Sequence, residues 1–347
     1  DTRVLEQHFE SAKRWVEFIR RNNPNLLWLK NRGNDYGDWL NGDTLILDGY
    51  PRGISAMPKE VFATAFFAHS AETVAKMAKV LGRTEDAAAY GALFGSIKAA
   101  FNQAYVSDDG RIRGNTQAGY ALALNFNLLD DARRSQAMAH LLEAIHAYKD
   151  HPSTGIHATH RMMIELSNNG RHDEACRLIN LRTVPSWGYM VDMDATTIWE
   201  RWDGYVKGRG FQNPGMNSFN HWAFGSVGEW IWRDLVGINP DEAQPGFKHF
   251  VIRPRPGGGL AWMKGRYDSI RGPIVSEWSF RSGAFDLTVG VPPNATATVF
   301  VPAKDAASVT EGGAFAAHAK GVSFLRMEDG CAVYVVESGR YVFASKE

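Results

Sequence analysis

The pattern of apolar and polar positions divides the chain into a helical part and a strand-rich part. Near the start, apolar residues recur at alternating steps of four and three, which places them on one face of a helix. They are Leu5, Phe9, Ala12, Val16 and Ile19. Similar patterns predict helices over residues 59–81, 84–105, 116–128, 131–149, 157–167, 173–180 and 217–235. The last of these, which holds Trp222, is expected to be largely buried. Gly82 is expected to end the second helix and Thr84 to cap the third.

The predicted helices follow one another in pairs. Short turns, such as Gly82-Arg83 and Gly170-Arg171, alternate with longer loops rich in Gly, Asp and Pro. This alternation predicts a toroid of helical hairpins with one set of loops at its mouth, and it also suits a helical solenoid. The sequence has no repeat of fixed period, which weakens the solenoid interpretation.

Beyond residue 237 the pattern changes to a period of two. Residues 238–246 contain two prolines and are interpreted as a linker. Strands are predicted over residues 285–291, 295–301, 331–337 and 340–345. Short strands separated by Gly and Pro turns predict an antiparallel β-sandwich. The predicted domains are therefore residues 1–237 and 247–347.

Composition excludes several classes of function. The chain of 347 residues has 38 basic and 38 acidic residues, and a net charge of zero argues against a nucleic-acid binder. No apolar run is long enough to span a membrane. The two cysteines, Cys176 and Cys331, lie in different predicted domains, so a disulfide framework is not expected. No Cys/His cluster has the spacing of a zinc site, and no cofactor is expected. The 11 Trp modestly favour a ligand that stacks on rings.

The most distinctive stretch is residues 195–204, in which Glu200 lies between Trp199 and Trp202. Indole faces cover the C–H face of a sugar, and their N–H groups bond hydroxyls. A carboxylate between them could activate water against a glycosidic carbon. The alternative is a buried pair of indoles with Glu200 in an ion pair with Arg201 or another arginine. For this motif alone, the two interpretations are about equally supported.

A second candidate segment is the polar loop 31–43, which carries several carboxylate and amide groups around Trp39. Loops carry function more often than the scaffold does, so this loop is a candidate for a functional role. The alternative is a solvated turn in which Trp39 fills the core.

Several motifs, taken together and in order, resemble the C-terminal half of bacterial α-L-rhamnosidases of glycoside hydrolase family 78. They are Tyr36-Gly37-Asp38-Trp39-Leu40, Pro185-Ser186-Trp187-Gly188-Tyr189-Met190, Ala195-Thr196-Thr197-Ile198-Trp199-Glu200-Arg201-Trp202, Asn217-Ser218-Phe219-Asn220-His221, Gly225-Ser226-Val227-Gly228-Glu229-Trp230, Pro245-Gly246-Phe247-Lys248-His249 and Ile252-Arg253-Pro254-Arg255-Pro256. The resemblance implies an (α/α)6 barrel, here incomplete, followed by a β-sandwich. It also implies removal of terminal α-L-rhamnose with inversion of configuration, so the expected partner is a rhamnose-containing carbohydrate.

The resemblance also implies roles for single residues. Glu200 corresponds to the general base, His221 to a contact with rhamnose, and Trp39 to the lining of the sugar subsite. Asp38 and Trp187 match motifs of the family without an assigned contact. Asp38 is expected to hold sugar hydroxyls, and Trp187 and Trp202 to wall the pocket.

Two departures from the family pattern affect this interpretation. The family's acidic motif with the general acid does not occur here, and the predicted helices fall short of twelve. The general acid is therefore expected upstream, and this chain is expected to be a fragment that is weakly active or inactive alone. The loop 153–160 also differs from the family after Thr154-Gly155. His157 and His160 there could touch ligand, although surface or capping roles are favoured.

Other functions remain open at this stage. The chain could be a glycosidase of this fold with another sugar specificity, a carbohydrate-binding fragment without catalysis, or a helical scaffold whose aromatic residues are all core. The chain starts at Asp1 without Met or a signal peptide, so its native N-terminus is expected to be absent. The compartment is open, with the bacterial cytoplasm or periplasm favoured.

Overall fold

The structure, a computed structural model, describes residues 1–216, 218–281 and 283–346. The chain divides into two compact units, Asp1–Gly225 and Ser226–Glu347. The sequence pattern changes later, at residue 237. The second unit begins earlier because the segment before the first strand packs with the strands: the indole N–H of Trp278 donates to the Leu235 carbonyl at 2.6 Å.

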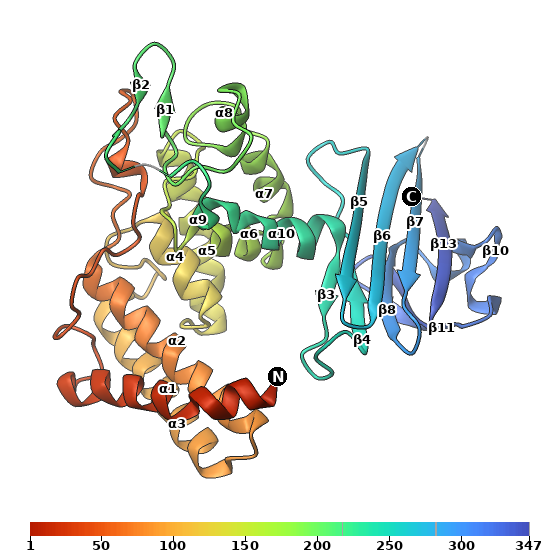
Figure 1. Cartoon of the computed structure of the whole chain (residues 1–347), viewed down its shortest axis with the longest axis horizontal. Helices are drawn as coiled ribbons and strands as arrows, with labels where there is room; N and C mark the ends of the chain where they lie inside the picture. Colours follow the sequence, from red (N-terminus) through yellow and green to blue (C-terminus); the bar gives the residue numbers. More distant parts are fainter. Residues whose placement is uncertain (217, 282, 347) are drawn as a thin grey trace. The chain divides into compact units, whose positions relative to one another are not determined.

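The first unit is built from helical hairpins, coloured red to green in Figure 1. Its helices are α1 (Thr2–Asn22), α2 (Lys59–Val80), α3 (Thr84–Tyr105), α4 (Gln117–Asn125), α5 (Asp131–Ala147), α6 (Thr159–Asn168), α7 (His172–Ile179), α8 (Trp187–Asp192) and α9 (Trp222–Gly225). The hairpin of α2 and α3 turns at Gly82, whose positive φ of 69° suits a residue without a side chain. Thr84 is the first residue of α3 and not its cap, a position that Arg83 takes.

Helix α4 lies at the centre of this unit. Residues 117–124 are all buried, and the helix packs against α2, α5 and α6. Its N-terminus is capped by Thr116, whose hydroxyl accepts the Gly119 N–H at 3.1 Å. A helix that is apolar on all sides is stable only when neighbours surround it, and the surrounding helices supply that cover.

The predicted helix 217–235 is wrong in its first part. Ser218 to His221 are not helical, because their backbone groups pair with residues 198–200. Helix α9 begins only at Trp222, and after Gly225 the chain continues as α10 (Val227–Trp230) and the π-helix η2 (Ile231–Val236). Trp222, expected to be buried, is 69% exposed. Asn217 lies outside the described residues.

The long loops of the first unit are joined by hydrogen bonds between segments far apart in the sequence. The backbone N–H of Ile46 donates to the Asp203 carboxylate at 2.8 Å, and the N–H of Gly42 donates to the Ser153 carbonyl at 2.9 Å. A short ribbon of β1 (Tyr205–Val206) and β2 (Gly210–Phe211) belongs to the same group of loops. Hydrogen bonds therefore connect the loop segments around residues 38–56, 151–158 and 198–212.

The second unit is a sandwich of two sheets. The six-stranded sheet has the order β10-β9-β13-β7-β6-β5, and the five-stranded sheet has the order β11-β12-β8-β4-β3. The strands are β3 (Ile238–Pro240), β4 (His249–Ile252), β5 (Trp262–Ser269), β6 (Gly272–Arg281), β7 (Ala284–Val291), β8 (Thr296–Pro302), β9 (Thr310–Glu311), β10 (Ala314–Phe315), β11 (Val322–Glu328), β12 (Cys331–Val336) and β13 (Gly339–Lys346).

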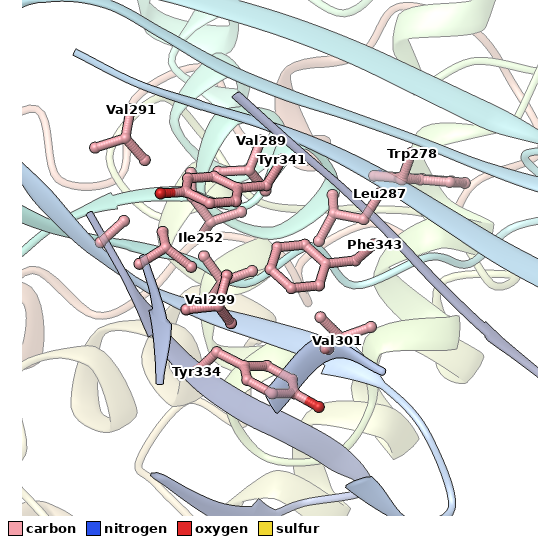
Figure 2. Close-up of a cluster of buried hydrophobic side chains, with 14 of the residues drawn as sticks. Ile252, Trp278, Leu287, Val289, Val291, Val299, Val301, Tyr334, Tyr341 and Phe343 are labelled. Atoms are coloured by element: carbon pink, nitrogen blue, oxygen red, sulfur yellow. The ribbon is translucent and has the colours of Figure 1, made fainter. Parts of the chain in front are cut away.

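Side chains of both sheets meet in one core (Figure 2). Leu287 and Phe343 come from the six-stranded sheet, and Val299 and Tyr334 come from the five-stranded sheet; all four are fully buried. The alternation that predicted β7, β8, β12 and β13 is therefore confirmed. Two details differ from expectation: β4 pairs with β8 in parallel, and the expected linker begins with β3, which pairs with β4.

Candidate active site

Glu200 lies on a two-segment ribbon stabilised by backbone hydrogen bonds. Its N–H donates to the Ser218 carbonyl at 2.9 Å, and the Ser218 N–H donates back to Glu200 Oε2 at 3.0 Å. The N–H of His221 donates to the Ile198 carbonyl at 2.9 Å. These bonds place the predicted base and the predicted sugar contact, His221, on adjacent segments.

The Glu200 side chain is half-buried, and only one of its two carboxylate oxygens accepts a hydrogen bond from the described residues. Oε2 accepts the Ser218 N–H, whereas Oε1 has no hydrogen-bond partner within the described chain. The neighbouring Arg201 is buried and directs its Nε to the Met216 carbonyl at 3.3 Å. Of the alternative interpretation, the buried pair of indoles is found, since Trp199 and Trp202 are 4% and 1% exposed, but within the described residues Glu200 forms no ion pair with Arg201 or another arginine. One carboxylate oxygen thus remains available for a water molecule or a ligand.

Packed rings support this ribbon from beneath. Trp199 is 4% exposed and makes edge contacts with Tyr189 and Phe219, at centroid distances of 6.4 and 5.3 Å. Because Trp199 and Phe219 lie on the two different segments, their contact ties the segments together. Trp199 therefore acts as part of the core and not as a sugar platform.

His221 presents one ring nitrogen as a donor. Its Nδ1 accepts the Ala223 N–H at 3.1 Å, so the proton of the neutral ring lies on Nε2. The side chain is half-buried, and its ring stacks beside Trp222 at a centroid distance of 6.1 Å. An Nε2–H donor next to an exposed indole is the pairing of polar and flat groups that a sugar ring requires.

Trp187 and Trp202 lie in the core of the unit. They are 5% and 1% exposed, and their rings meet edge to face at 5.1 Å. Both indole N–H groups donate to backbone carbonyls, Trp187 to Phe224 at 3.0 Å and Trp202 to Thr154 at 3.1 Å. The expectation that these two rings wall a pocket is therefore corrected: with their N–H groups bonded, they brace the loops. Sequence alone does not separate a ring at a pocket from a ring beneath it.

Asp38 is also buried, at 2% exposure, and its carboxylate accepts three backbone N–H groups. The donors are Gly155 at 2.6 Å, His157 at 3.0 Å and Ala158 at 3.0 Å. Burial raises the pKa of this carboxyl to about 6, although the three N–H bonds and the Arg161 charge oppose the change. With its oxygens so occupied, Asp38 positions the loop 155–158. This corrects the expectation that it holds sugar hydroxyls.

The residues 154–156 connect three of the predicted site residues. The Thr154 carbonyl accepts from Trp202, the Gly155 N–H donates to Asp38, and the Ile156 N–H donates to the Trp39 carbonyl at 2.8 Å. Two motifs that are widely separated in the sequence, residues 36–40 and 195–202, thus converge on one tripeptide. The tertiary structure therefore packs the loop that carries Trp39 and the segment that carries Glu200 and Trp202 against the same stretch of backbone.

Trp39 is half-buried and makes an edge contact with Tyr36 at 5.2 Å. Tyr36 is 61% exposed and borders a hollow of about 230 Å³, which His157 also lines. His157 packs between Phe62 and Phe66, at centroid distances of 5.4 and 5.7 Å, and burial lowers the pKa of its imidazole. The position of His157 at a hollow keeps a ligand contact possible. His160 lies on α6 and is half-buried.

Sequence reasoning missed two exposed aromatic residues, Tyr36 and Trp222. Neither was given a role, although Tyr36 opens the motif Tyr36-Gly37-Asp38-Trp39-Leu40 and Trp222 directly follows the motif that ends at His221. The signal was therefore present, but periodicity placed Trp222 inside a buried helix. Trp222 is exposed because the helix begins only at that residue.

Over residues 1–216, 218–281 and 283–346, no group of three or more His, Cys, Asp or Glu side chains could hold a metal ion. Within the same ranges, no helix has the length and apolar character needed to cross a bilayer. Both cysteines, Cys176 and Cys331, are free thiols.

Comparison with protein families gives two matches that together cover most of the chain. Residues 1–235 match the bacterial alpha-L-rhamnosidase 6 hairpin glycosidase domain. The chain belongs to the bacterial α-L-rhamnosidase family. Residues 237–316 match the C-terminal domain of the same family. The resemblance inferred from the motifs is thereby confirmed, and so is the fold class of a six-hairpin helical domain followed by a sheet domain.

Individual rhamnosidases align over nearly the whole chain. The Alpha-L-rhamnosidase of Streptomyces avermitilis is 43% identical over 99% of this chain and 31% of its own length. One from Formosa agariphila is 33% identical over 100% of this chain and 36% of its own length. The chain therefore spans about a third of the length of these curated relatives.

Solved structures of the family agree with the fold. The Streptomyces avermitilis alpha-L-rhamnosidase complexed with L-rhamnose has a TM-score of 0.88 and 42% identity, covering 100% of this chain and 31% of that protein. The alpha-L-rhamnosidase from Dictyoglumus thermophilum has a TM-score of 0.86 and 31% identity, covering 100% of this chain and 38% of that one.

Proposed function

We propose that this chain supplies the base and part of the sugar subsite of an α-L-rhamnosidase, which hydrolyses terminal α-L-rhamnosides with inversion. The observation that carries the proposal is the Glu200 carboxylate. It is half-buried, held through Oε2 by the Ser218 N–H, and forms no ion pair with a basic side chain of the described chain. A fixed carboxylate with one oxygen that accepts no hydrogen bond from the described chain suits a general base.

In the proposed reaction, Oε1 of Glu200 takes a proton from a water molecule while the water oxygen attacks the anomeric carbon of rhamnose. The bond from that carbon to the leaving oxygen breaks, and its electron pair stays on the departing oxygen. A general acid, which the family resemblance puts upstream of this chain, protonates that oxygen. Attack from the face opposite the leaving group inverts the anomeric centre.

The other residues divide into two groups. His221, through Nε2–H, would donate to a sugar hydroxyl, and the exposed rings of Trp222 and Tyr36, with Trp39, would cover a sugar face. Asp38, Trp187 and Trp202 are positioning residues, since they hold the loops without an open group of their own. L-rhamnose is the proposed ligand, because a similar rhamnosidase was solved in complex with L-rhamnose.

The test uses an aryl α-L-rhamnoside whose leaving group departs without protonation, so that the base alone limits the rate. Glu200→Gln should lower the rate of phenol release by roughly 10²–10⁴-fold and leave L-rhamnose binding, measured by calorimetry, nearly unchanged. Glu242→Gln, at an exposed glutamate, is the matched control and should behave as the parent. Hydrolysis by Glu200→Gln at the parental rate would remove Glu200 as the base.

The same assay distinguishes the other interpretations. Binding of L-rhamnose without release of phenol by the parent chain would indicate a carbohydrate-binding fragment. Faster hydrolysis of another aryl glycoside would indicate another sugar specificity. NMR detection of β-L-rhamnose as the first product would support inversion.

A further inference from the structure

The outer face of the six-stranded sheet carries a hollow that lies wholly within the second unit. Its volume is about 380 Å³, and strands β5, β6 and β7 line it. Trp262, at the start of β5, borders the hollow and is 60% exposed. A single exposed aromatic residue is ordinary on a protein surface, so the surrounding side chains decide whether this one belongs to a site.

The strand register places a set of polar side chains beside this indole. Trp262 lies opposite Ser279, which lies opposite Asp286 on the next strand. One row further along, Lys264 lies opposite Glu277, which lies opposite Thr288. Residues opposite one another in neighbouring strands share a face, and so do residues two apart along a strand. All six therefore point away from the core that Leu287 and Trp278 enter (Figure 2).

The charged residues of this face do not pair with one another. Lys264 and Glu277 are direct cross-strand neighbours of opposite charge, yet within the described residues neither forms an ion pair or a side-chain hydrogen bond. The same holds for Arg281 and Asp286, which also line the hollow. Opposite charges across an antiparallel pair usually stabilise it by making contact. Here two cations and two carboxylates are instead spread around a concave surface with their hydrogen-bonding capacity unused.

We propose that this face, defined by Trp262, Lys264, Glu277, Arg281 and Asp286, binds a neutral saccharide at a site distinct from the one that contains Glu200. The indole covers the C–H face of a sugar ring, carboxylates accept from its hydroxyls, and the ammonium and guanidinium groups donate to them. Two positive and two negative charges cancel, so the face has no net attraction for an anionic sugar. The volume is within the range of small-molecule sites.

The proposal assigns no catalysis to this face. A saccharide held here would keep the protein attached to a polymeric or glycosylated material while another site acts on it. Once one part of such a material is bound here, its other sugar groups stay close to the protein, so their effective concentration at a second site rises. The inference does not depend on rhamnose hydrolysis, because it would stand for any catalytic specificity of the first unit.

The experiment screens the whole chain against an array of neutral and uronate-containing oligosaccharides, and measures the best neutral ligand by calorimetry. Trp262→Ala should weaken that binding roughly tenfold or more, and Trp262→Phe should restore part of it because a ring remains. Phe324→Ala, at an exposed ring on the other sheet, is the matched control and should bind as the parent. Circular dichroism of each variant verifies that the sandwich is folded.

A further variant separates this face from the first unit. Trp39→Ala should leave the neutral ligand's affinity for the sandwich unchanged, and Trp262→Ala should leave hydrolysis of an aryl rhamnoside unchanged. Three results would overturn the proposal: no neutral oligosaccharide bound at millimolar concentration, a preference for uronate-containing ligands, or binding that Trp262→Ala leaves intact. A ligand lost in Trp39→Ala but kept in Trp262→Ala would place sugar binding in the first unit alone.

Discussion

The Asp38 carboxylate accepts the backbone N–H of Gly155 at 2.6 Å, across 117 positions of the chain. The same glycine lies so close to the loop of Trp39 that a Cβ on Gly155 would approach the Trp39 carbonyl oxygen to 2.2 Å. Two loops thus meet backbone to backbone, with the carboxylate of one satisfying the N–H groups of the other. This contact positions the loop that carries Trp39.

Gly155→Ala is expected to destabilise the helical unit by about 1–3 kcal/mol or more, because neither backbone can move without breaking the Asp38 bonds. Urea unfolding measures the change. Gly91→Ala is the matched control: no heavy atom lies within 4 Å of its added Cβ, and it lies within α3. There alanine should stabilise by about 0.5–1 kcal/mol. Equal stability of Gly155→Ala and the parent would mean that the loops do not approach so closely.

The buried Asp38 carboxyl should make stability depend on pH. Its pKa is about 6 in the folded protein against 3.8 for the ordinary group, so the native state holds the proton more tightly. The resulting contribution to the free energy of unfolding is complete below pH 3.8 and is lost as the pH rises through 6. A rise in pKa of this size corresponds to roughly 3 kcal/mol of unfolding free energy at most.

Asp38→Asn removes that titration and isolates it from every other group. The free energy of unfolding of the parent, relative to this variant, should fall between pH 4 and pH 7. Asp48→Asn, at an exposed aspartate, should show no comparable trend. A difference between parent and Asp38→Asn that stays constant with pH would show that folding does not raise the pKa of Asp38.

His221→Ala should weaken L-rhamnose binding by roughly threefold to tenfold, since it removes one neutral hydrogen-bond donor, Nε2–H. Calorimetry with L-rhamnose measures it. His146→Ala, at a histidine whose side chain is 83% exposed, is the control. Undiminished affinity in His221→Ala would separate His221 from the sugar subsite.

The chain should discriminate between substrates by their leaving groups. If the general acid lies upstream of this chain, as proposed, the departing oxygen leaves unprotonated, which costs a natural glycoside roughly 10²–10⁴-fold in rate and an activated aryl rhamnoside much less. Comparing kcat/KM for the two substrates, against one of the longer relatives, measures this difference. Equal losses on both substrates would point to missing subsite walls and not to the proton donor.

The sequence by itself determined the family and many of the elements. Periods of 3.6 and 2 depend only on which face of an element is buried, so α1, α2, α3 and the strands β7, β8, β12 and β13 could be read from spacing alone. The ordered motifs identified the family, and they marked Glu200 and His221, which the structure places on adjacent segments.

Only the tertiary structure decided which of the marked side chains face outward. Asp38, Trp187 and Trp202 looked like pocket residues, but their polar atoms are bonded to the backbone of other loops. Trp222 looked like core and is exposed, because the pairing of Ser218 with Glu200 delays the start of its helix. A side chain's exposure depends on the hydrogen bonds and packing of segments that are distant in the sequence. The residues next to it in the chain do not indicate which distant segments it will contact.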